Sequence, residues 1–350
     1  MDSLNEAGPK VSFARWAAAV AFLLTAAALL VLVFFPGSSL ASVVSERLGV
    51  AHLLAFSAIF GLVLILGAVC AITVLLAQRR ILRRSPGLRS VTISATVMLL
   101  LAGLGLVLWP SGSSVPVEAE QSADGARGTL TVAVYNSQDT LTAADLLQLD
   151  RLGNPDVIVL PEGGEYAAER AIASSGLPFT VHSTRDQGFT AAYSGGIAPT
   201  TILTRADRIQ FTQNDALPTS FGSVSLTSAD RAGYSILGVH SAPPLPALMD
   251  AWRTDLKTIA ESAASEIPDI IAGDFNATLR HGPLARIQGY KDASLACSAR
   301  GVGTWPLSLP DSLAAPIDHV LVRSDTKIQR CASSQIGHGD HRAVIVTIAR

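Results

Sequence analysis

Three long apolar stretches occupy the first third of the chain, at about residues 16–35, 50–77 and 91–109. None of them contains Asp, Glu, Lys or Arg, and their only histidine is His52. Each is long enough to cross a bilayer as a helix, which needs about 20 residues. A cleaved signal peptide is the alternative for the first stretch, but its apolar part would be only about 7–15 residues long. The pattern therefore predicts three transmembrane helices within residues 1–110.

The arginines between the apolar stretches predict the orientation of the chain in the membrane. The loop at 78–90 holds five arginines and no acid, whereas the first loop holds the single Arg47. Positive loops stay in the cytoplasm, which places this loop and the N-terminus, with Lys10 and Arg15, inside. Three spans then put everything after Trp109 outside. We expect a multi-pass protein of the plasma (inner) membrane with a cytoplasmic N-terminus and an extracytoplasmic C-terminal domain.

The rest of the chain has a different pattern. Residues 111–128 are small and polar with Pro and Gly, which is typical of a flexible linker. Residues 129–350 are long enough for one domain with its own core. Short apolar runs predict strands at 129–136, 155–162, 179–184, 200–205, 223–228, 234–241, 268–276, 316–324, 327–335 and 342–350. Apolar residues at helical spacing predict helices at 164–176 and 248–266. Many short strands with few helices predict a packed two-sheet core with helices outside.

Charge and cysteine content narrow the choices for this domain. Residues 111–350 contain 18 Lys and Arg against 25 Asp and Glu, a net charge of −7. Because proteins that grip nucleic acid through its phosphates usually present a basic face, this balance argues mildly against such a binder. Cys297 and Cys331 form an even pair in the outer domain and either form a disulfide or remain two separate buried thiols.

Polar side chains stand at the ends of several apolar strands. Asp274 and Asn276 are two residues apart at the end of the run 268–276, so strand alternation would put them on one face. Similar polar residues end other strands and form a candidate set. The set comprises Asn136, Glu162, His240, Asp274, Asn276, Asp318, Asp340 and His341.

Each of these residues alone has an ordinary explanation as a turn or capping residue. Together they offer carboxylates, amides and imidazoles with almost no lysine. Oxygen ligands in this proportion suit a hard cation such as Mg²⁺. Two histidines beside carboxylates suit proton transfer near neutral pH. A hard metal, histidines and amide donors are the groups that phosphoester hydrolysis needs.

The order of these motifs resembles the endonuclease/exonuclease/phosphatase (deoxyribonuclease I-like) superfamily. The matching segments are "VAVYN", "PDVIVLPE", "ILGVHS", "GDFNAT", "TWP…PIDHVLV" and "GHGDHRAVIV". They cover nearly all of the outer domain and none of the membrane part. Gly339 replaces the usual serine of the last motif, and Pro161 replaces the usual Gln before the Glu. The resemblance implies an α/β fold, a four-layer α/β sandwich of two packed β-sheets flanked by helices, with the site at one rim. The Arg-heavy, Ala-rich composition favours a membrane-anchored bacterial member.

The resemblance also implies roles for the metal-proximal residues. Glu162 would be the principal Mg²⁺ ligand, with Mn²⁺ or Ca²⁺ as alternative ions. Asn136 and Asp340 would lie close to the metal or its waters. Asp274 and Asn276 would orient the attacking water and contact phosphate oxygens.

The resemblance implies two alternative roles for each histidine. His341, oriented by Asp318, would act as the general base or as a cationic phosphate clamp. His240 would contact the phosphate or assist the leaving group.

These observations predict a membrane-anchored, extracytoplasmic, divalent-metal-dependent phosphoesterase, acting on a phosphodiester or phosphomonoester. An 18-residue flexible linker spans about 20–25 Å, which favours lipid headgroups or envelope phosphodiesters. Nucleic acid is disfavoured by the acidic domain but stays open as a substrate. A non-catalytic binding or scaffold protein with the same fold is the alternative. A function within the spans is weakly supported, because they hold no ionisable residue of the kind expected there except His52.

Overall fold

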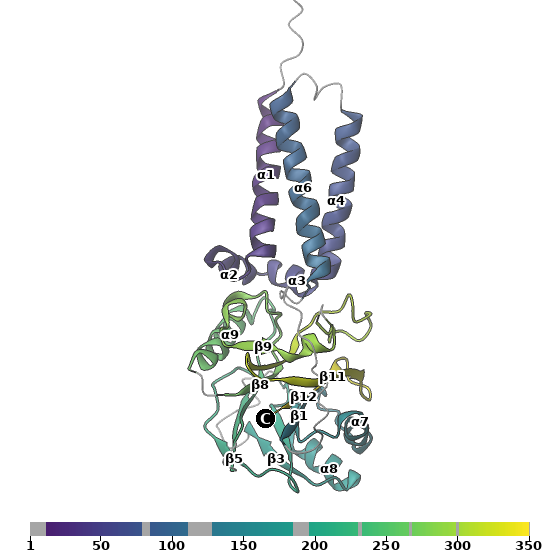
Figure 1. Ribbon diagram of the computed structural model, residues 1–350, viewed down its shortest axis with the longest axis vertical. Coiled ribbons are helices and arrows are strands. Elements are labelled where there is room, and N and C mark those ends of the chain that lie inside the picture. The colour runs from purple at the N-terminus through teal and green to yellow at the C-terminus, as the bar shows by residue number, and fades with distance from the viewer. Residues whose placement is uncertain are drawn as a thin grey trace, which may run out of the picture.

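The computed structural model describes residues 12–78, 85–110, 128–184, 196–229, 233–265, 268–298 and 301–349. An N-terminal helical bundle stands on an α/β domain, and the chain crosses the length of the bundle three times before it enters the domain (Figure 1). The predicted linker, apart from Gly128, lies outside the described residues, as do Lys10 and the arginines within 79–84.

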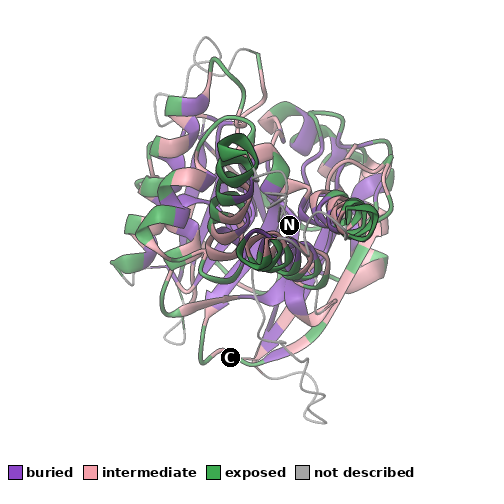
Figure 2. Ribbon diagram, turned by 90° about the horizontal axis from the view of Figure 1, so that it is seen from above, coloured by how far each residue is buried: buried purple, intermediate pink, exposed green. Residues whose placement is uncertain are grey.

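Three helices of the bundle are long and apolar enough to cross a membrane. They are α1 Phe13–Phe34, α4 Ser57–Ala77 and α6 Pro86–Leu108, with mean hydropathies of 2.7, 2.9 and 2.4. Seen end-on in Figure 2, they carry exposed residues along their length, whereas the sheets beneath are mostly buried. An apolar outer surface of this kind suits a lipid environment. Small residues bring α4 and α6 together, because a Cβ on Gly61 would lie 2.6 Å from the carbonyl oxygen of Gly103.

The second predicted span divides into two helices at Phe56. Residues Val50–Ala55 form the short α3, and α4 begins at Ser57. Together with α2 (Ser39–Ser45), α3 lies at the end of the bundle nearest the domain (Figure 1). The break does not stand out in the sequence, because apolar residues run through both helices; α3 contacts the domain, as described below.

The domain contains two six-stranded sheets. The first sheet has the strand order β11-β12-β1-β2-β4-β3, and the second has the order β5-β6-β7-β8-β10-β9. Strands of the first sheet are β1 Thr129–Val134, β2 Val157–Leu160, β3 Phe179–Ser183, β4 Thr201–Arg205, β11 Ile328–Gln335 and β12 Arg342–Ala349. Strands of the second are β5 Phe211–Asn214, β6 Ser223–Ser228, β7 Ser235–His240, β8 Ile270–Asp274, β9 Tyr290–Asp292 and β10 Asp318–Arg323.

The two sheets pack face to face with helices on their outer sides. Residues such as Val132 and Val159 of the first sheet join Ala272 and Val320 of the second in the central core. Helices α7 (Ala143–Gly153) and α8 (Glu165–Ser175) cover the outer face of the first sheet. Helix α9 (Met249–Ala264) and the 3₁₀ helix η2 (Gly282–Arg286) cover the second. These layers confirm the predicted four-layer α/β sandwich.

Most predicted strands and helices are present, with a few additions. Helix α7 was not predicted, although Thr142 and Asp145 form a capping box at its start. The short strands β5 and β9 were also not predicted. Cys297, next to the 3₁₀ helix η3 (Ala293–Ala296), forms a disulfide with Cys331 of β11. The disulfide is therefore the alternative that the structure adopts.

The segment after β8 fastens the domain to the base of the bundle. Arg280 is 2% exposed and donates hydrogen bonds to the carbonyls of Val33 (2.9 Å) and Pro110 (3.3 Å), and also to that of Trp109. These carbonyls lie at the C-terminal ends of α1 and α6, where a cation is favourable. His281 Nε2 lies 3.0 Å from the carbonyl oxygen of Ala51 in α3. The domain thus packs directly against the helices, closer than the reach expected from the linker.

Candidate active site

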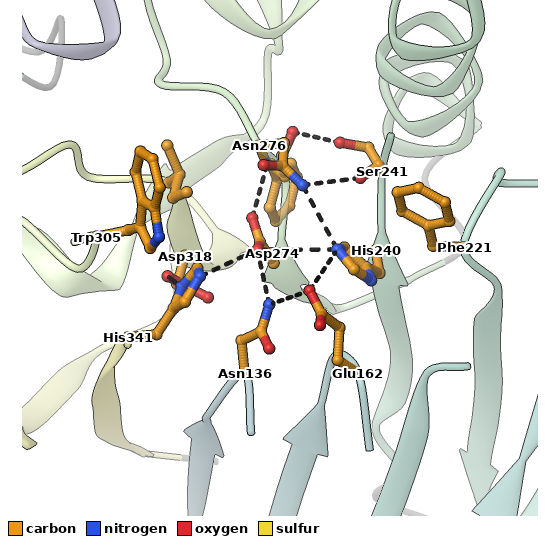
Figure 3. A network of polar contacts seen from close by, with 12 residues as sticks. Asn136, Glu162, Phe221, His240, Ser241, Asp274, Asn276, Trp305, Asp318 and His341 are labelled. Atoms are coloured by element: carbon orange, nitrogen blue, oxygen red, sulfur yellow. Dashed lines mark hydrogen bonds and ion pairs between the residues drawn. The ribbon is translucent and has the colours of Figure 1, made fainter. Parts of the chain in front are cut away.

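The register of the second sheet places three candidate residues side by side. In the parallel pair β7–β8, His240 is opposite Asp274, and in the antiparallel pair β8–β10, Asp274 is opposite Asp318. All three are 1% exposed. Figure 3 shows these side chains meeting at the rim of the sheets, with Asn136 and Glu162 reaching them from the other sheet.

Asn136 links the two sheets at this rim. It follows β1, and its Nδ2 donates to Glu162 Oε1 and to Asp274 Oδ2, both at 3.1 Å. Glu162 follows β2, where its positive φ of 51° turns the chain away from the sheet. Its side chain is 25% exposed, in contrast to its buried neighbours. Glu162 therefore presents a carboxylate at the mouth of the site.

Asp274 and Asn276 lie in the same site, but a turn brings them together. Strand β8 ends at Asp274, and Asn276 has a positive φ of 45°. Asp274 Oδ1 accepts a hydrogen bond of 2.7 Å from the backbone N–H of Asn276. Asn276 Nδ2 donates to the carbonyl of Ser241 at 2.9 Å and lies 3.4 Å from His240 Nε2. The expected strand alternation is replaced by this local turn.

Asp318 and His341 form the shortest charged pair of the site. His341 Nδ1 lies 2.7 Å from Asp318 Oδ2, and both residues are buried. The other ring nitrogen, Nε2, lies 3.9 Å from Asp274 Oδ2 and 3.7 Å from Asp340 Oδ1. Burial alone lowers the pKa of His341, but the Asp318 carboxylate, helped by Asp274 and Asp340, raises it to about 10. The imidazole is therefore held in its charged form.

The pKa values of the other titratable groups shift in directions that suit proton transfer. Burial, then the nearby His341, lowers the pKa of His240 to about 3, so this imidazole is neutral at pH 7. Phe221 packs against it with ring centroids 5.0 Å apart. Burial, then the Asp318 carboxylate, raises the pKa of Asp274 to about 7. Burial also raises the pKa of Glu162. One neutral and one protonated histidine thus lie beside a carboxyl group whose pKa is near neutrality.

The donor set of the site fits a divalent metal. Asp274, Asp318 and His341 each offer a ligand atom, and these atoms lie within 4.8 Å of one another. Glu162 and Asp340 add two more carboxylates. Among the described residues, Asp340 Oδ1 and Asp318 Oδ1 are buried without a hydrogen-bond partner. Crowded oxygen ligands with unused lone pairs match what a hard cation binds.

Three neighbours of the site were not among the predicted residues. Trp305 donates from Nε1 to Asp340 Oδ2 at 2.8 Å, and its ring centroid lies 6.4 Å from that of His341. Phe221 and Ser241 contact His240 and Asn276 as described above. Trp305 belongs to the quoted "TWP" motif, which was the one sequence signal for it; the other two act through packing or a backbone carbonyl, which sequence does not mark.

Comparisons with known proteins identify a matching family. The model of the Endonuclease/Exonuclease/phosphatase family matches residues 133–341. A search of curated proteins gives no match. Among solved structures, D. rerio TDP2 complexed with a single-strand DNA product is similar at 18% identity and a TM-score of 0.49, covering 64% of this chain and 100% of that chain. The human Nocturnin catalytic domain with bound sulfate is similar at 12% identity and a TM-score of 0.47, covering 68% and 99%.

An endonuclease/exonuclease/phosphatase family protein from Bacteroides thetaiotaomicron is similar at 14% identity and a TM-score of 0.47, covering 64% of this chain and 98% of that chain. The family model spans more than half of the chain and includes every candidate site residue from Asn136 to His341. The chain belongs to the endonuclease/exonuclease/phosphatase family.

Proposed function

We propose that the protein is a membrane-anchored, divalent-metal-dependent phosphoesterase whose family domain lies outside the cytoplasm. One observation carries the proposal: the rim of the two sheets gathers four carboxylates, two amides and two imidazoles, one neutral and one protonated. Members of this family typically hydrolyse phosphoesters with a metal. The alternative of a non-catalytic scaffold has no observation of its own in its favour.

Two groups of residues are candidate ligands for the metal. Glu162, Asp340 and Asn136 are the ligands that the sequence motifs favour. The buried group described above, with Asp274 at its centre, is the second candidate. A bound divalent cation would act as a Lewis acid that neutralises charge on the phosphate oxygens. We assign the principal ligand to Glu162, because its carboxylate is more exposed than those of Asp274 and Asp318 and is oriented by Asn136.

The protein's own groups then divide the proton chemistry. Asp274, with its pKa near neutrality, would accept the proton of the attacking water, held in place by Asn136 and Asn276. Asp318 keeps His341 protonated, which favours the cationic phosphate clamp over the general base for this histidine. His240 is neutral and would donate or accept a single hydrogen bond at the leaving oxygen.

The position of the site favours a substrate at the membrane surface. Trp305 contacts His341 on one side and Phe56, at the junction of α3 and α4, on the other, with ring centroids 6.0 Å apart. Through Trp305, the site rim therefore connects to the end of the helical bundle. Lipid headgroups or envelope phosphoesters are the substrates that we favour, and the net charge of −7 disfavours nucleic acid.

Two features support an extracytoplasmic domain. The arginines between the second and third spans favour a cytoplasmic loop, which leaves the domain on the opposite side. The disulfide between Cys297 and Cys331 is typical of oxidising compartments.

The test uses the full chain reconstituted in nanodiscs with Mg²⁺ or Mn²⁺. Phosphate or headgroup release is measured from phospholipid, from an oligonucleotide and from a small chromogenic phosphodiester. We expect hydrolysis that EDTA abolishes, with phospholipid preferred over oligonucleotide. A preference for the oligonucleotide would overturn the substrate class. A folded protein that binds metal but hydrolyses none of the three would favour the scaffold alternative.

A further inference from the structure

A groove of about 870 Å³ lies between α9 and η2, on the side of the domain that contacts α2. It is separate from the candidate active site, because none of the candidate site residues lines it. Six of the lining side chains are charged. They are Arg253, Lys257, Arg286 and Arg323, with the acids Glu46 and Glu261. Four cations against two acids make this groove a local exception in a domain whose net charge is −7.

Acids beside the groove offset part of this positive charge, and one of them is Asp250, which pairs with Arg253 at 2.8 Å. Glu261 pairs with Lys257 at 3.7 Å on the exposed face of α9, where such pairs are weak. Burial raises the pKa of Glu46, although the nearby Arg253 and Arg286 oppose this shift. Arg286 is exposed at the end of η2. With Asp250 included, four cations face three acids, so the charge at the groove is positive on balance.

The groove begins where the domain meets the membrane-proximal helices. Glu46 is the residue that ends α2, and its backbone carbonyl accepts hydrogen bonds from Arg253 at 3.0 and 3.2 Å. Helix α2 buries Ser45 toward the domain, whereas Leu40 and Val43 are 59% and 53% exposed. An exposed apolar face on a short helix at the end of a transmembrane bundle suits the bilayer interface. The groove therefore opens at the level of the lipid headgroups.

We propose that this groove binds the phosphate of an anionic lipid headgroup at the membrane surface. Arginine presents a planar fork of donors that matches phosphate oxygens, and lysine adds a mobile point charge. Arg253 is held by the Glu46 carbonyl and by Asp250, so it orders one wall of the site, and the exposed Lys257 and Arg286 are the cations that would meet the phosphate. Such a site would hold the domain against the bilayer beside its helical anchor, in addition to the contacts of Arg280.

The test titrates the full chain, in detergent micelles with EDTA, with dioleoylphosphatidylglycerol and counts bound lipids by native mass spectrometry. The variant is Lys257→Gln with Arg286→Gln, two exposed side chains whose replacement leaves packing intact. The control is Arg151→Gln with Arg170→Gln, which makes the same charge change on α7 and α8, away from the bundle. Each Lys or Arg near a membrane surface contributes about a fivefold change in affinity, so we expect about 30-fold weaker binding in the variant.

Three further readings decide the proposal. The control variant should bind phosphatidylglycerol with an affinity within about threefold of the wild type. The affinity for dioleoylphosphatidylcholine should differ by no more than about threefold between the variant and the wild type. Equal loss of phosphatidylglycerol binding in variant and control would show bulk charge attraction and overturn the site. Free glycerol phosphate that competes as well as the lipid would overturn the lipid as the source of the phosphate. Because EDTA removes divalent metal, the result is independent of whether the active site hydrolyses phosphoesters.

Discussion

Arg280 of the α/β domain donates a hydrogen bond of 2.9 Å to the carbonyl of Val33, in the last turn of α1. Its guanidinium also bonds the carbonyls of Trp109 and Pro110 beyond α6, so one cation caps two helices of the bundle. Burial lowers the pKa of Arg280 to about 10, which still leaves it charged at neutral pH. Arg280 is six residues from Asp274, so the segment that leaves the candidate active site is the one that contacts the bundle.

We predict that Arg280→Met destabilises the full-length protein by roughly 3 kcal/mol or more, because three carbonyls lose their charged donor in a buried place. The measurement is the thermal unfolding midpoint in detergent by intrinsic fluorescence. Arg280→Lys, which keeps the charge but can satisfy fewer carbonyls, should lie between the wild type and Arg280→Met. An unchanged midpoint in Arg280→Met would show that the bundle and the domain are not coupled through this contact.

The two site histidines should differ in charge over the whole neutral range. In metal-free protein, His240 should stay neutral down to pH 5, since its pKa is about 3, and His341 should stay protonated up to pH 8, since its pKa is about 10. Carbon-13-labelled histidine spectra recorded from pH 5 to 8 measure both, with His240→Gln and His341→Gln for assignment. Titration of either ring near pH 6.5 would contradict the burial and pairing described above.

Asp318→Asn should remove the stabilisation of the His341 charge while it keeps the ring in its position. The amide can still accept the Nδ1–H bond, but it no longer stabilises the imidazolium, so we expect kcat to fall by about 100-fold. Asp292→Asn is the matched control, because Asp292 and His319 form a second buried pair at the same 2.7 Å distance. The control should retain most of its kcat. Equal losses in both variants would mean that buried pairs matter here only for folding.

Metal affinity distinguishes the two candidate ligand groups. If Glu162 is the principal ligand, Glu162→Gln should weaken Mn²⁺ binding by on the order of 100-fold, measured by calorimetry on the full chain. Asp318→Asn should weaken it far less, because Asp318 is committed to His341. The reverse order would move the metal to the buried group of Asp274, Asp318 and His341.

The sequence predicts the sandwich and the site because both depend on local patterns. Near-continuous apolar runs such as 155–162 mark strands that are buried on both faces, and polar residues at their ends mark the rim where they converge. The features that the sequence does not predict depend on tertiary contacts. The break at Phe56, the capping of α1 by Arg280 and the role of Trp305 need partners that lie far away in the chain.

The helix and strands that were not predicted carry weak or overlooked signals in the sequence. Helix α7 carries the capping box of Thr142 and Asp145, a readable signal that the coarse strand pattern overshadowed. The short strands β5 and β9 are at sheet edges, where few residues and partial burial leave little periodicity. Asn276 shares the site with Asp274 through a turn, so the predicted proximity holds although the predicted backbone conformation does not.

We propose that Asp274 serves metal-dependent phosphoester hydrolysis at the rim of the two sheets. The most direct test compares the full-length wild type with Asp274→Asn in nanodiscs, with Mg²⁺ and a chromogenic phosphodiester, beside Asp207→Asn as a surface control. We expect metal-dependent turnover in the wild type and the control, and a loss of about 100-fold or more in Asp274→Asn. Turnover by Asp274→Asn equal to that of the wild type would contradict the claim.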